Sequence, residues 1–146
     1  MSYSKIMVPV APDHGPEAGR AMEVARSLLS PGGRITVLSV IEELPRYLTA
    51  DIYSIGPVVV EKERAVADAV KEEFGGAPDV TVVTRIGHGA RTILDLAEDG
   101  GHDCIVIASA QPGWQHTLMG STASGVVRHA HCSVHVLRET GSGPTA

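Results

Sequence analysis

Short apolar runs rich in Val and Ile alternate along this chain with longer segments whose apolar residues recur at helical spacing. We expect the short runs to be strands, at residues 5–10, 34–41, 80–86, 104–108 and 133–137. The segments between them read as helices that start near residues 16, 59, 90 and 120. This alternation predicts an α/β fold, an open five-stranded parallel sheet with helices on both faces and right-handed crossovers.

The apolar composition agrees with such a sheet. Aromatic residues make up only 3% of the 146 residues, although 43% are hydrophobic, so Val, Ile, Leu and Ala must build the core. Aliphatic, β-branched strands are typical of parallel sheets buried on both faces. In the expected strand order 3-2-1-4-5, the winding direction reverses between the first and fourth strands. A ligand crevice is therefore expected at the carboxyl ends of those strands, lined by residues 11–15 and 109–121.

Charge and composition exclude several classes of function. Twelve basic residues face 17 acidic ones, for a net charge of −5, so we expect no nucleic-acid partner. No apolar run approaches the length of a membrane span, and the first residues do not resemble a signal peptide. The two cysteines, Cys104 and Cys132, are too few for a disulfide framework and are expected as free thiols. We therefore expect a cytoplasmic protein with one domain over residues 1–138 and a flexible tail over 139–146.

Two segments have more than one interpretation. Residues 42–57 are too apolar for a linker and too irregular for a confident helix or strand, and they could close over the crevice or pack at a dimer interface. Gly120, Ser121 and Thr122 open the last helix. They predict either an anion site or an ordinary helix start in which a hydroxyl accepts from a first-turn amide.

Three segments together resemble the universal stress proteins. They are KIMVPV near the start, RIGHGARTILDLAEDGGHDCIVIAS in the middle and LMGSTASGVVRHAHCSVHVL near the end. The resemblance spans roughly residues 4 to 138. It implies a Rossmann-like fold of the adenine nucleotide alpha hydrolase type, a role in the stress response and a homodimer. The last strand, Ser133 to Leu137, would be an edge strand and is expected to pair with a second copy.

The resemblance also makes ATP or AMP a candidate ligand, through a motif that this chain keeps only in part. ATP-binding members carry Gly-x-x-Gly, nine residues, then Gly-Ser or Gly-Thr. Here Gly120 and Ser121 remain, but Ala108 and Gln111 stand at the two earlier glycines. Ala11 stands at the family's Asp, for which Asp13 is a possible substitute. The resemblance thus supports the fold more strongly than it supports ATP, and another small anionic ligand, or none, stays open.

The residues expected to line the crevice come from the ends of the first, second and fourth strands and the start of the last helix. They are Pro9, Val10, Ala11, Asp13, Val40, Ala108, Ser109, Gly113, Gly120, Ser121 and Thr122. Trp114, in the loop before the last helix, is a candidate contact for a ligand or a protein partner. The alternative is that it folds back and covers the apolar end of the sheet.

No catalytic or metal site is expected. Ser109, Ser121 and Ser124 lack a Gly-x-Ser-x-Gly context. His116 is the nearest candidate base and His88 is another, but the sequence places no His–acid pair to serve these serines. The run His-x-His-Cys-x-x-His at 129–135 could suggest a metal, but its side chains should diverge along a turn and a strand. The alternatives to a regulatory binding module are a weak ATPase or nucleotide hydrolase and a module that binds only protein partners.

Overall fold

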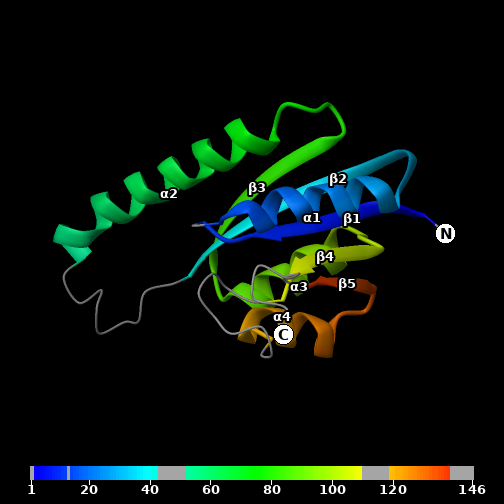
Figure 1. Ribbon diagram of the computed structural model, residues 1–146. Helices are drawn as coiled ribbons and strands as arrows, with labels where there is room; N and C mark the ends of the chain where they lie inside the picture. The colour runs from blue at the N-terminus through cyan, green and yellow to red at the C-terminus, as the bar shows by residue number, and fades with distance from the viewer. Residues whose placement is uncertain (1, 13, 43–51, 110–118, 139–146) are drawn as a thin grey trace, which may run out of the picture.

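The fold is a five-stranded parallel sheet in the order β3-β2-β1-β4-β5, as the sequence predicts (Figure 1). It was obtained as a computed structural model, which describes residues 2–12, 14–42, 52–109 and 119–138, with the backbone alone over 52–59. The strands are β1 (Tyr3–Val10), β2 (Leu29–Glu42), β3 (Val80–Gly87), β4 (Cys104–Ala108) and β5 (Ser133–Leu137). The helices are α1 (Pro16–Leu28), α2 (Ile52–Phe74), α3 (Gly89–Asp99) and α4 (Ser121–His129).

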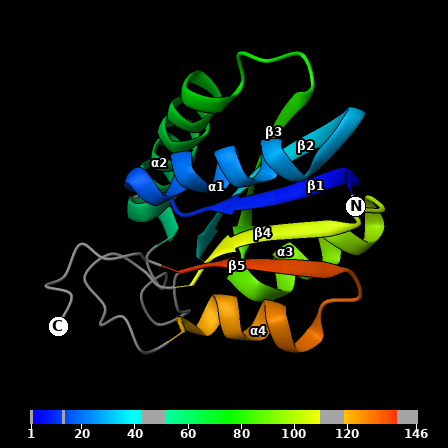
Figure 2. The ribbon, with the colours of Figure 1, turned by 45° about the vertical axis from the view of Figure 1, so that its right-hand side comes forward.

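The sheet separates two apolar clusters. Figure 2 shows α1 and α2 on one face and α3 and α4 on the other. In β1, Ile6 and Val8 belong to the cluster under α1 and α2, whereas Met7 belongs to the cluster under α3 and α4. All three are at most 1% exposed. Because side chains alternate between the faces of a strand, a central strand covered on both sides must be apolar at every position.

Two boundaries differ from the sequence prediction. Residues 52–57, expected to be irregular, belong to α2, which begins at Ile52. The second strand begins at Leu29, before the Pro31-Gly32-Gly33 turn that was expected to precede it. Tyr3 pairs with Leu29 and Lys5 with Arg34, so the extra residues bulge out of the ladder between these two pairs. Gly32 has a φ of 79°, a conformation that glycine adopts without steric cost, and this permits the bulge.

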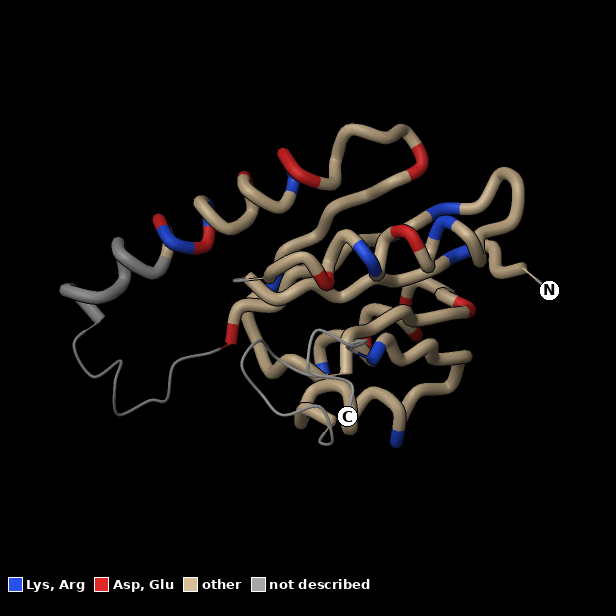
Figure 3. The backbone as a smooth tube through the Cα atoms, viewed as in Figure 1, with Lys and Arg blue, Asp and Glu red and all other residues tan. Residues whose placement is uncertain are grey.

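Charged residues of both signs are interspersed on α1, α2 and α3 (Figure 3). No described helix is long and apolar enough to span a membrane. The carboxyl-terminal half of α2 packs on the sheet through Val70, with Val66 and Phe74 partly buried beside it. Its amino-terminal turns extend away from the sheet (Figure 1).

His14 connects this packed end of α2 to the loop that follows β1. Its Nε2 lies 2.5 Å from Glu73 Oε2 and its Nδ1 lies 3.0 Å from the carbonyl oxygen of Ala11. Its ring also contacts the ring of Phe74, with centroids 5.5 Å apart. Both polar partners can only accept, so both ring nitrogens donate and the imidazole is favoured in its charged form. Burial alone lowers the pKa of His14, but these bonds and the charges of Glu73 and Glu17 outweigh it and raise the pKa.

The amino edge of the sheet is held by Asp103. Its Oδ2 accepts from the Ser4 amide at 2.9 Å and the Ser4 hydroxyl at 3.0 Å, and its Oδ1 accepts from the Lys5 amide at 3.0 Å. The Asp103 amide donates in turn to the Lys5 carbonyl at 2.9 Å. This carboxylate fixes the start of β4 against the start of β1. Desolvation raises the pKa of Asp103, but the hydrogen bonds from Ser4 and Lys5 exceed it and lower the pKa.

Replacing Glu73 by Gln should destabilise the protein only where His14 is charged. Because the folded-state pKa of His14 is raised, its stabilisation is fully present below the unfolded pKa and is lost as pH rises through the folded value. We expect Glu73→Gln to lower the free energy of unfolding by about 1 kcal/mol near pH 6 and very little near pH 9. Urea unfolding at both pH values measures this. Glu72→Gln, at an exposed neighbour, should show no such pH dependence, and equal losses at both pH values for Glu73→Gln would contradict the pairing.

Replacing Asp103 by Asn should destabilise the protein at neutral pH by about 1–3 kcal/mol, because the amide nitrogen cannot accept from the Ser4 amide and hydroxyl. The folded-state pKa of Asp103 is lowered, so its stabilisation exists above the ordinary pKa and is lost as pH falls through the lowered one. The difference between wild type and Asp103→Asn should therefore shrink in acid. Denaturant unfolding against pH is the measurement, with Asp99→Asn, at an exposed carboxylate on α3, as the matched control.

Candidate functional site

The candidate site begins where β1 and β4 stop pairing. These neighbouring strands pair at Ile6 with Cys104 and at Met7 with Ile105, and no further pair joins them although β1 runs to Val10 and β4 to Ala108. Pro9 has no amide hydrogen to offer to a ladder in this segment. By contrast, β1 stays paired with β2 as far as Val10, and β4 stays paired with β5 as far as Ala108. The carboxyl edge of the sheet therefore opens between β1 and β4, at the topological switch point that the sequence predicts.

The β1 side of this opening contains four of the expected residues. Pro9 pairs with Leu38 and Val10 with Ser39, which places both at the end of β1 beside β2. Val10 is 5% exposed and packs into the cluster under α1, so its side chain lies on the face of the sheet that α1 and α2 cover. Val40 packs on the opposite face, in the cluster that also contains Ile107, Met119 and Ala123. Ala11 is half-buried and contributes its carbonyl to His14.

The β4 side brings together the end of β4 and the start of α4. The carbonyl of Ser109 accepts from the Gly120 amide at 2.7 Å, and the Ser109 amide donates to the Leu137 carbonyl at 2.9 Å. Ser109 is 5% exposed, so it contributes backbone geometry more than a reactive hydroxyl. Ala108 pairs with Leu137 as the last residue of β4. These bonds fix α4 directly beyond the opening.

The start of α4 differs from the expected capping arrangement. Gly120 is the N-cap, and no side chain of the described residues makes the capping hydrogen bond. Ser121 is the first helical residue and is exposed, so its hydroxyl does not occupy the capping position that the sequence suggested. Thr122 is half-buried and lies against α3, where its Oγ1 is 3.2 Å from the position that a Cβ on Gly89 would take.

Two other helices also begin at this edge of the sheet, and each of their amino ends holds a carboxylate. Glu17 Oε1 accepts from the Gly15 amide, the N-cap of α1, at 2.7 Å. Glu42 Oε1, at the end of β2, accepts from the Gly89 amide, the first residue of α3, at 3.1 Å. Helix amino ends carry partial positive charge, so these carboxylates neutralise α1 and α3 from within the chain. Among the described residues no carboxylate does the same for α4.

One buried polar group near the end of β2 lacks a partner. The hydroxyl of Ser39 is fully buried and makes no hydrogen bond in the described part of the chain. Its neighbours along the same face of β2, Ile35 and Val37, belong to the cluster under α1 and α2. Ser39 therefore lies on the face of the sheet opposite to α3 and α4, and it is not one of the groups that surround the start of α4.

Several predicted contributors lie outside the described residues: Asp13, Gly113, Trp114 and His116. Sequence reasoning, in turn, missed Glu17, Glu42, Gly89 and His14. A signal for Glu42 was present, because an acidic residue directly after a strand lies at the same edge as the helix starts. Nothing local indicated that this carboxylate would bond Gly89, which is distant in sequence.

His88, Cys104 and Cys132 are chemically reactive residues whose surroundings the structure describes. His88 Nδ1 accepts from the Arg91 amide at 3.4 Å as the N-cap of α3, and no group of three or more His, Cys, Asp or Glu within the described ranges could hold a metal ion. Cys104 and Cys132 are both free. Burial raises the pKa of the Cys104 thiol to about 11, with a smaller effect of Cys132, so Cys104 is a protonated packing residue at neutral pH.

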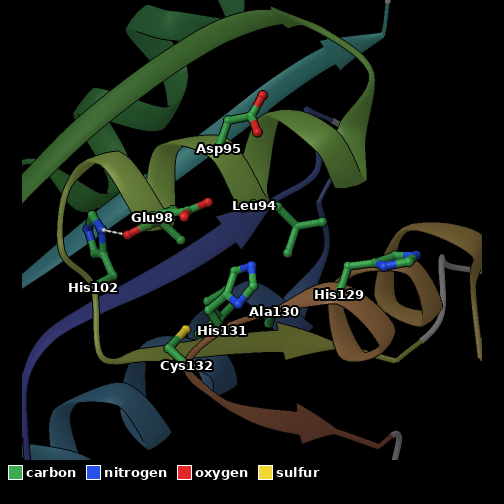
Figure 4. Close-up of a pocket in the computed structure, with 10 residues that line it drawn as sticks. Leu94, Asp95, Glu98, His102, His129, Ala130, His131 and Cys132 are labelled. Atoms are coloured by element: carbon green, nitrogen blue, oxygen red, sulfur yellow. Dashed lines mark hydrogen bonds between the residues drawn. The ribbon is translucent and has the colours of Figure 1, made fainter.

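A separate cavity lies at the opposite edge of the sheet (Figure 4). It has a volume of about 370 Å³ and lies between the second half of α3 and the turn from α4 to β5. Figure 4 shows Asp95 and Glu98 on α3 on one side, with His131 and Cys132 on the other. His102 lines it but is already bonded, to the Ala97 carbonyl at 3.3 Å and Thr36 Oγ1 at 2.9 Å. Desolvation lowers the pKa of His102, in keeping with a neutral structural histidine.

Comparison with known proteins agrees with this geometry. The model of the universal stress protein family matches residues 2–138. Universal stress protein G of Shigella flexneri is 43% identical over 54 residues, which cover 37% of this chain and 38% of that protein. Universal stress protein UspA from Lactobacillus plantarum is 26% identical, with a TM-score of 0.78 over 94% of this chain and 99% of that one. A universal stress protein solved in complex with cAMP shares the fold at 18% identity, with a TM-score of 0.59 over 94% and 98%. The chain belongs to the universal stress protein family.

Proposed function

We propose that this protein is a regulatory binding module of the stress response, acting in the cytoplasm, that takes a nucleotide or another small anionic ligand in the crevice between β1 and β4. One observation carries the proposal. Of the helices that begin at the open edge, α1 and α3 hold internal carboxylates, and α4 has none among the described residues. An anion entering the crevice would therefore find its electrostatic partner at Gly120, Ser121 and Thr122.

The apolar surroundings fit the remainder of such a ligand. Val40 belongs to the apolar cluster that also contains Met119 and Ala123 beside the start of α4, and small-molecule sites combine apolar walls with a few convergent polar groups. The relative solved in complex with cAMP binds a nucleotide that carries one phosphate on the same fold. ATP-binding members have glycines at the positions of Ala108 and Gln111. A ligand that uses only the amino end of α4 does not need those two glycines.

A weak nucleotide hydrolase is the alternative in the same crevice. It requires a base or a metal beside the phosphate, and no group of three or more His, Cys, Asp or Glu in the described part of the chain could hold a metal ion. We therefore favour binding without turnover. Measuring phosphate release from ATP separates the two functions.

Nucleotide binding should raise the thermal stability of the protein. At about 100 times Kd a ligand stabilises the folded state by about 2.7 kcal/mol, which should raise Tm by several degrees in a chain of this size. We expect such a shift with AMP, and replacing Ser121 by Glu should abolish it, because the new carboxylate would repel the phosphate. Differential scanning fluorimetry with and without nucleotide is the measurement.

Ser121→Glu should leave the unliganded protein intact, since an acidic residue in the first turn of a helix is favourable. Thr81→Glu, at an exposed position near the start of β3, is the matched control and should keep the full nucleotide shift. If nucleotide still raised the Tm of Ser121→Glu, the anion would have to bind elsewhere. No shift in the wild type with any nucleotide would overturn nucleotide binding.

We also propose that the protein forms a homodimer through β5. This strand pairs with β4 along its whole length and has no other partner strand in the described sheet. Ser133 and His135 are exposed on it, while Val134 and Val136 are only partly buried. A short edge strand with partly exposed apolar residues is suited to pairing across a two-fold axis. The loop around Trp114 stays a candidate surface for a different protein.

Acidic side chains on β5 should dissociate the dimer. In the double variant Ser133→Glu with His135→Glu, like charges from the two copies would face each other across the two-fold axis. Sedimentation velocity should then report a monomer, where the wild type gives a dimer. The matched control, Thr81→Glu with Arg85→Glu, places acids at exposed positions on β3, the other edge strand, and should remain dimeric. Dissociation by the β3 pair alone would assign the interface to that edge instead.

A further inference from the structure

We propose that the cavity between α3 and the turn from α4 to β5 is a second binding site, which takes a small organic cation such as an aliphatic diamine (Figure 4). Its volume of about 370 Å³ is within the range of small-molecule sites. None of its lining residues belongs to the crevice between β1 and β4, so the inference goes beyond the proposed function and does not depend on nucleotide binding.

The floor of the cavity is apolar. Ala97 on α3 and Ile105 on β4 are 4% and 0% exposed, and both belong to the cluster that α3 and α4 cover. Leu94 and Ala130 are partly buried beside them and complete this apolar floor. Figure 4 shows Leu94 pointing from α3 toward the turn. Such a surface suits the methylene groups of an aliphatic chain, which gain free energy when they leave water.

The polar groups around this floor are mainly hydrogen-bond acceptors. Asp95 and Glu98 bring two carboxylates, and neither side chain has a hydrogen bond or an ion pair within the described part of the chain. The carboxyl end of α4 also lies here, because His129 is its last residue and Ala130 its C-cap. The last carbonyls of a helix lack partner amides within it and carry partial negative charge. A ligand that matches these groups is a donor with positive charge.

The chain does not supply that cation itself. No lysine or arginine is among the described residues that line the cavity. The amine of Lys5 donates to the Gly100 carbonyl at 2.5 Å, at the end of α3. His102 is a neutral histidine with both ring nitrogens bonded, and desolvation raises the pKa of the Cys132 thiol, which keeps it uncharged. The fixed charges of the lining are therefore both negative.

The first test follows the methyl groups of the protein by NMR while putrescine, an aliphatic diamine, is added at pH 8, where an ordinary histidine is neutral. We expect the methyl signals of the apolar floor to shift and to saturate at millimolar concentration. The methyl signals of Val66 and Val70, in the cluster on the other face of the sheet, should stay unchanged. The diol of the same chain length has hydroxyls in place of the ammonium groups, and it should bind at least about tenfold more weakly.

The double variant Asp95→Asn with Glu98→Gln removes both fixed charges and keeps the shapes of the side chains. It should weaken putrescine binding about tenfold. Asp68→Asn with Glu72→Gln is the matched control, because it makes the same change in net charge at exposed positions on α2. This control should bind putrescine as tightly as the wild type.

Alkylation of Cys132 by iodoacetamide gives a second measurement, since this half-buried thiol lines the cavity. Bound putrescine should slow the reaction. Cys104 is 1% exposed and burial raises its pKa to about 11, so it should not react at a comparable rate.

Three results would overturn the inference. Equal binding of putrescine and the diol would exclude a site selective for cations. Equal weakening in the two double variants would mean that putrescine is attracted to the acidic protein as a whole. Saturating shifts confined to other methyl groups, or no shift and no protection of Cys132, would show that the cavity does not bind the amine.

Discussion

The structure depends on the complete burial of β1 between two layers of helices. Ile6, Met7 and Val8 are all at most 1% exposed, and the strand is bonded to β2 on one side and β4 on the other. An aliphatic strand in this position contributes apolar burial to both clusters at once, at about 25 cal/mol per Å². Its position also defines the site, because the reversal of winding occurs between β1 and β4.

The same edge of the sheet concentrates the amino ends of helices, which creates an electrostatic problem as well as a binding opportunity. Helices that begin side by side bring several unsatisfied amides and partial positive charges together. Two carboxylates of the chain neutralise this charge in part: Glu17 at the amino end of α1 and Glu42 at the amino end of α3. The charge of the crevice is therefore set by which helix starts are neutralised internally, as much as by the loop that the family resemblance emphasises.

Most of the fold was predictable from the sequence. The strand runs were found because each is a short apolar segment between turn residues, and the order 3-2-1-4-5 followed from topology and resemblance. The start of α2 was missed, since Pro57 and the mixed apolar residues of 52–57 interrupt a clear helical period. The start of β2 was missed because Pro31-Gly32-Gly33 is a strong turn signal that here forms a bulge inside the strand.

The site was less predictable than the fold. The opening and the start of α4 follow from topology, and the structure brings Ser109 and Gly120 together there. The interpretation in which a hydroxyl caps the start of α4 was wrong, because Gly120 is the N-cap and Ser121 follows it. The bonds that neutralise α1 and α3 depend on side-chain reach. The bond from Glu42 to Gly89 joins residues far apart in the chain, and neither periodicity nor a motif encodes such a contact.

The separation of the two apolar clusters by the sheet has a consequence for how proteins of this architecture can diverge. The helices α1 and α2 contribute to one cluster, and α3 and α4 to the other, and the strands lie between the two clusters. Substitutions on the two faces then have few shared neighbours, so their effects on stability should combine almost independently. One layer can accumulate change, and acquire a new recognition surface, while the layer that carries the ligand edge keeps its packing.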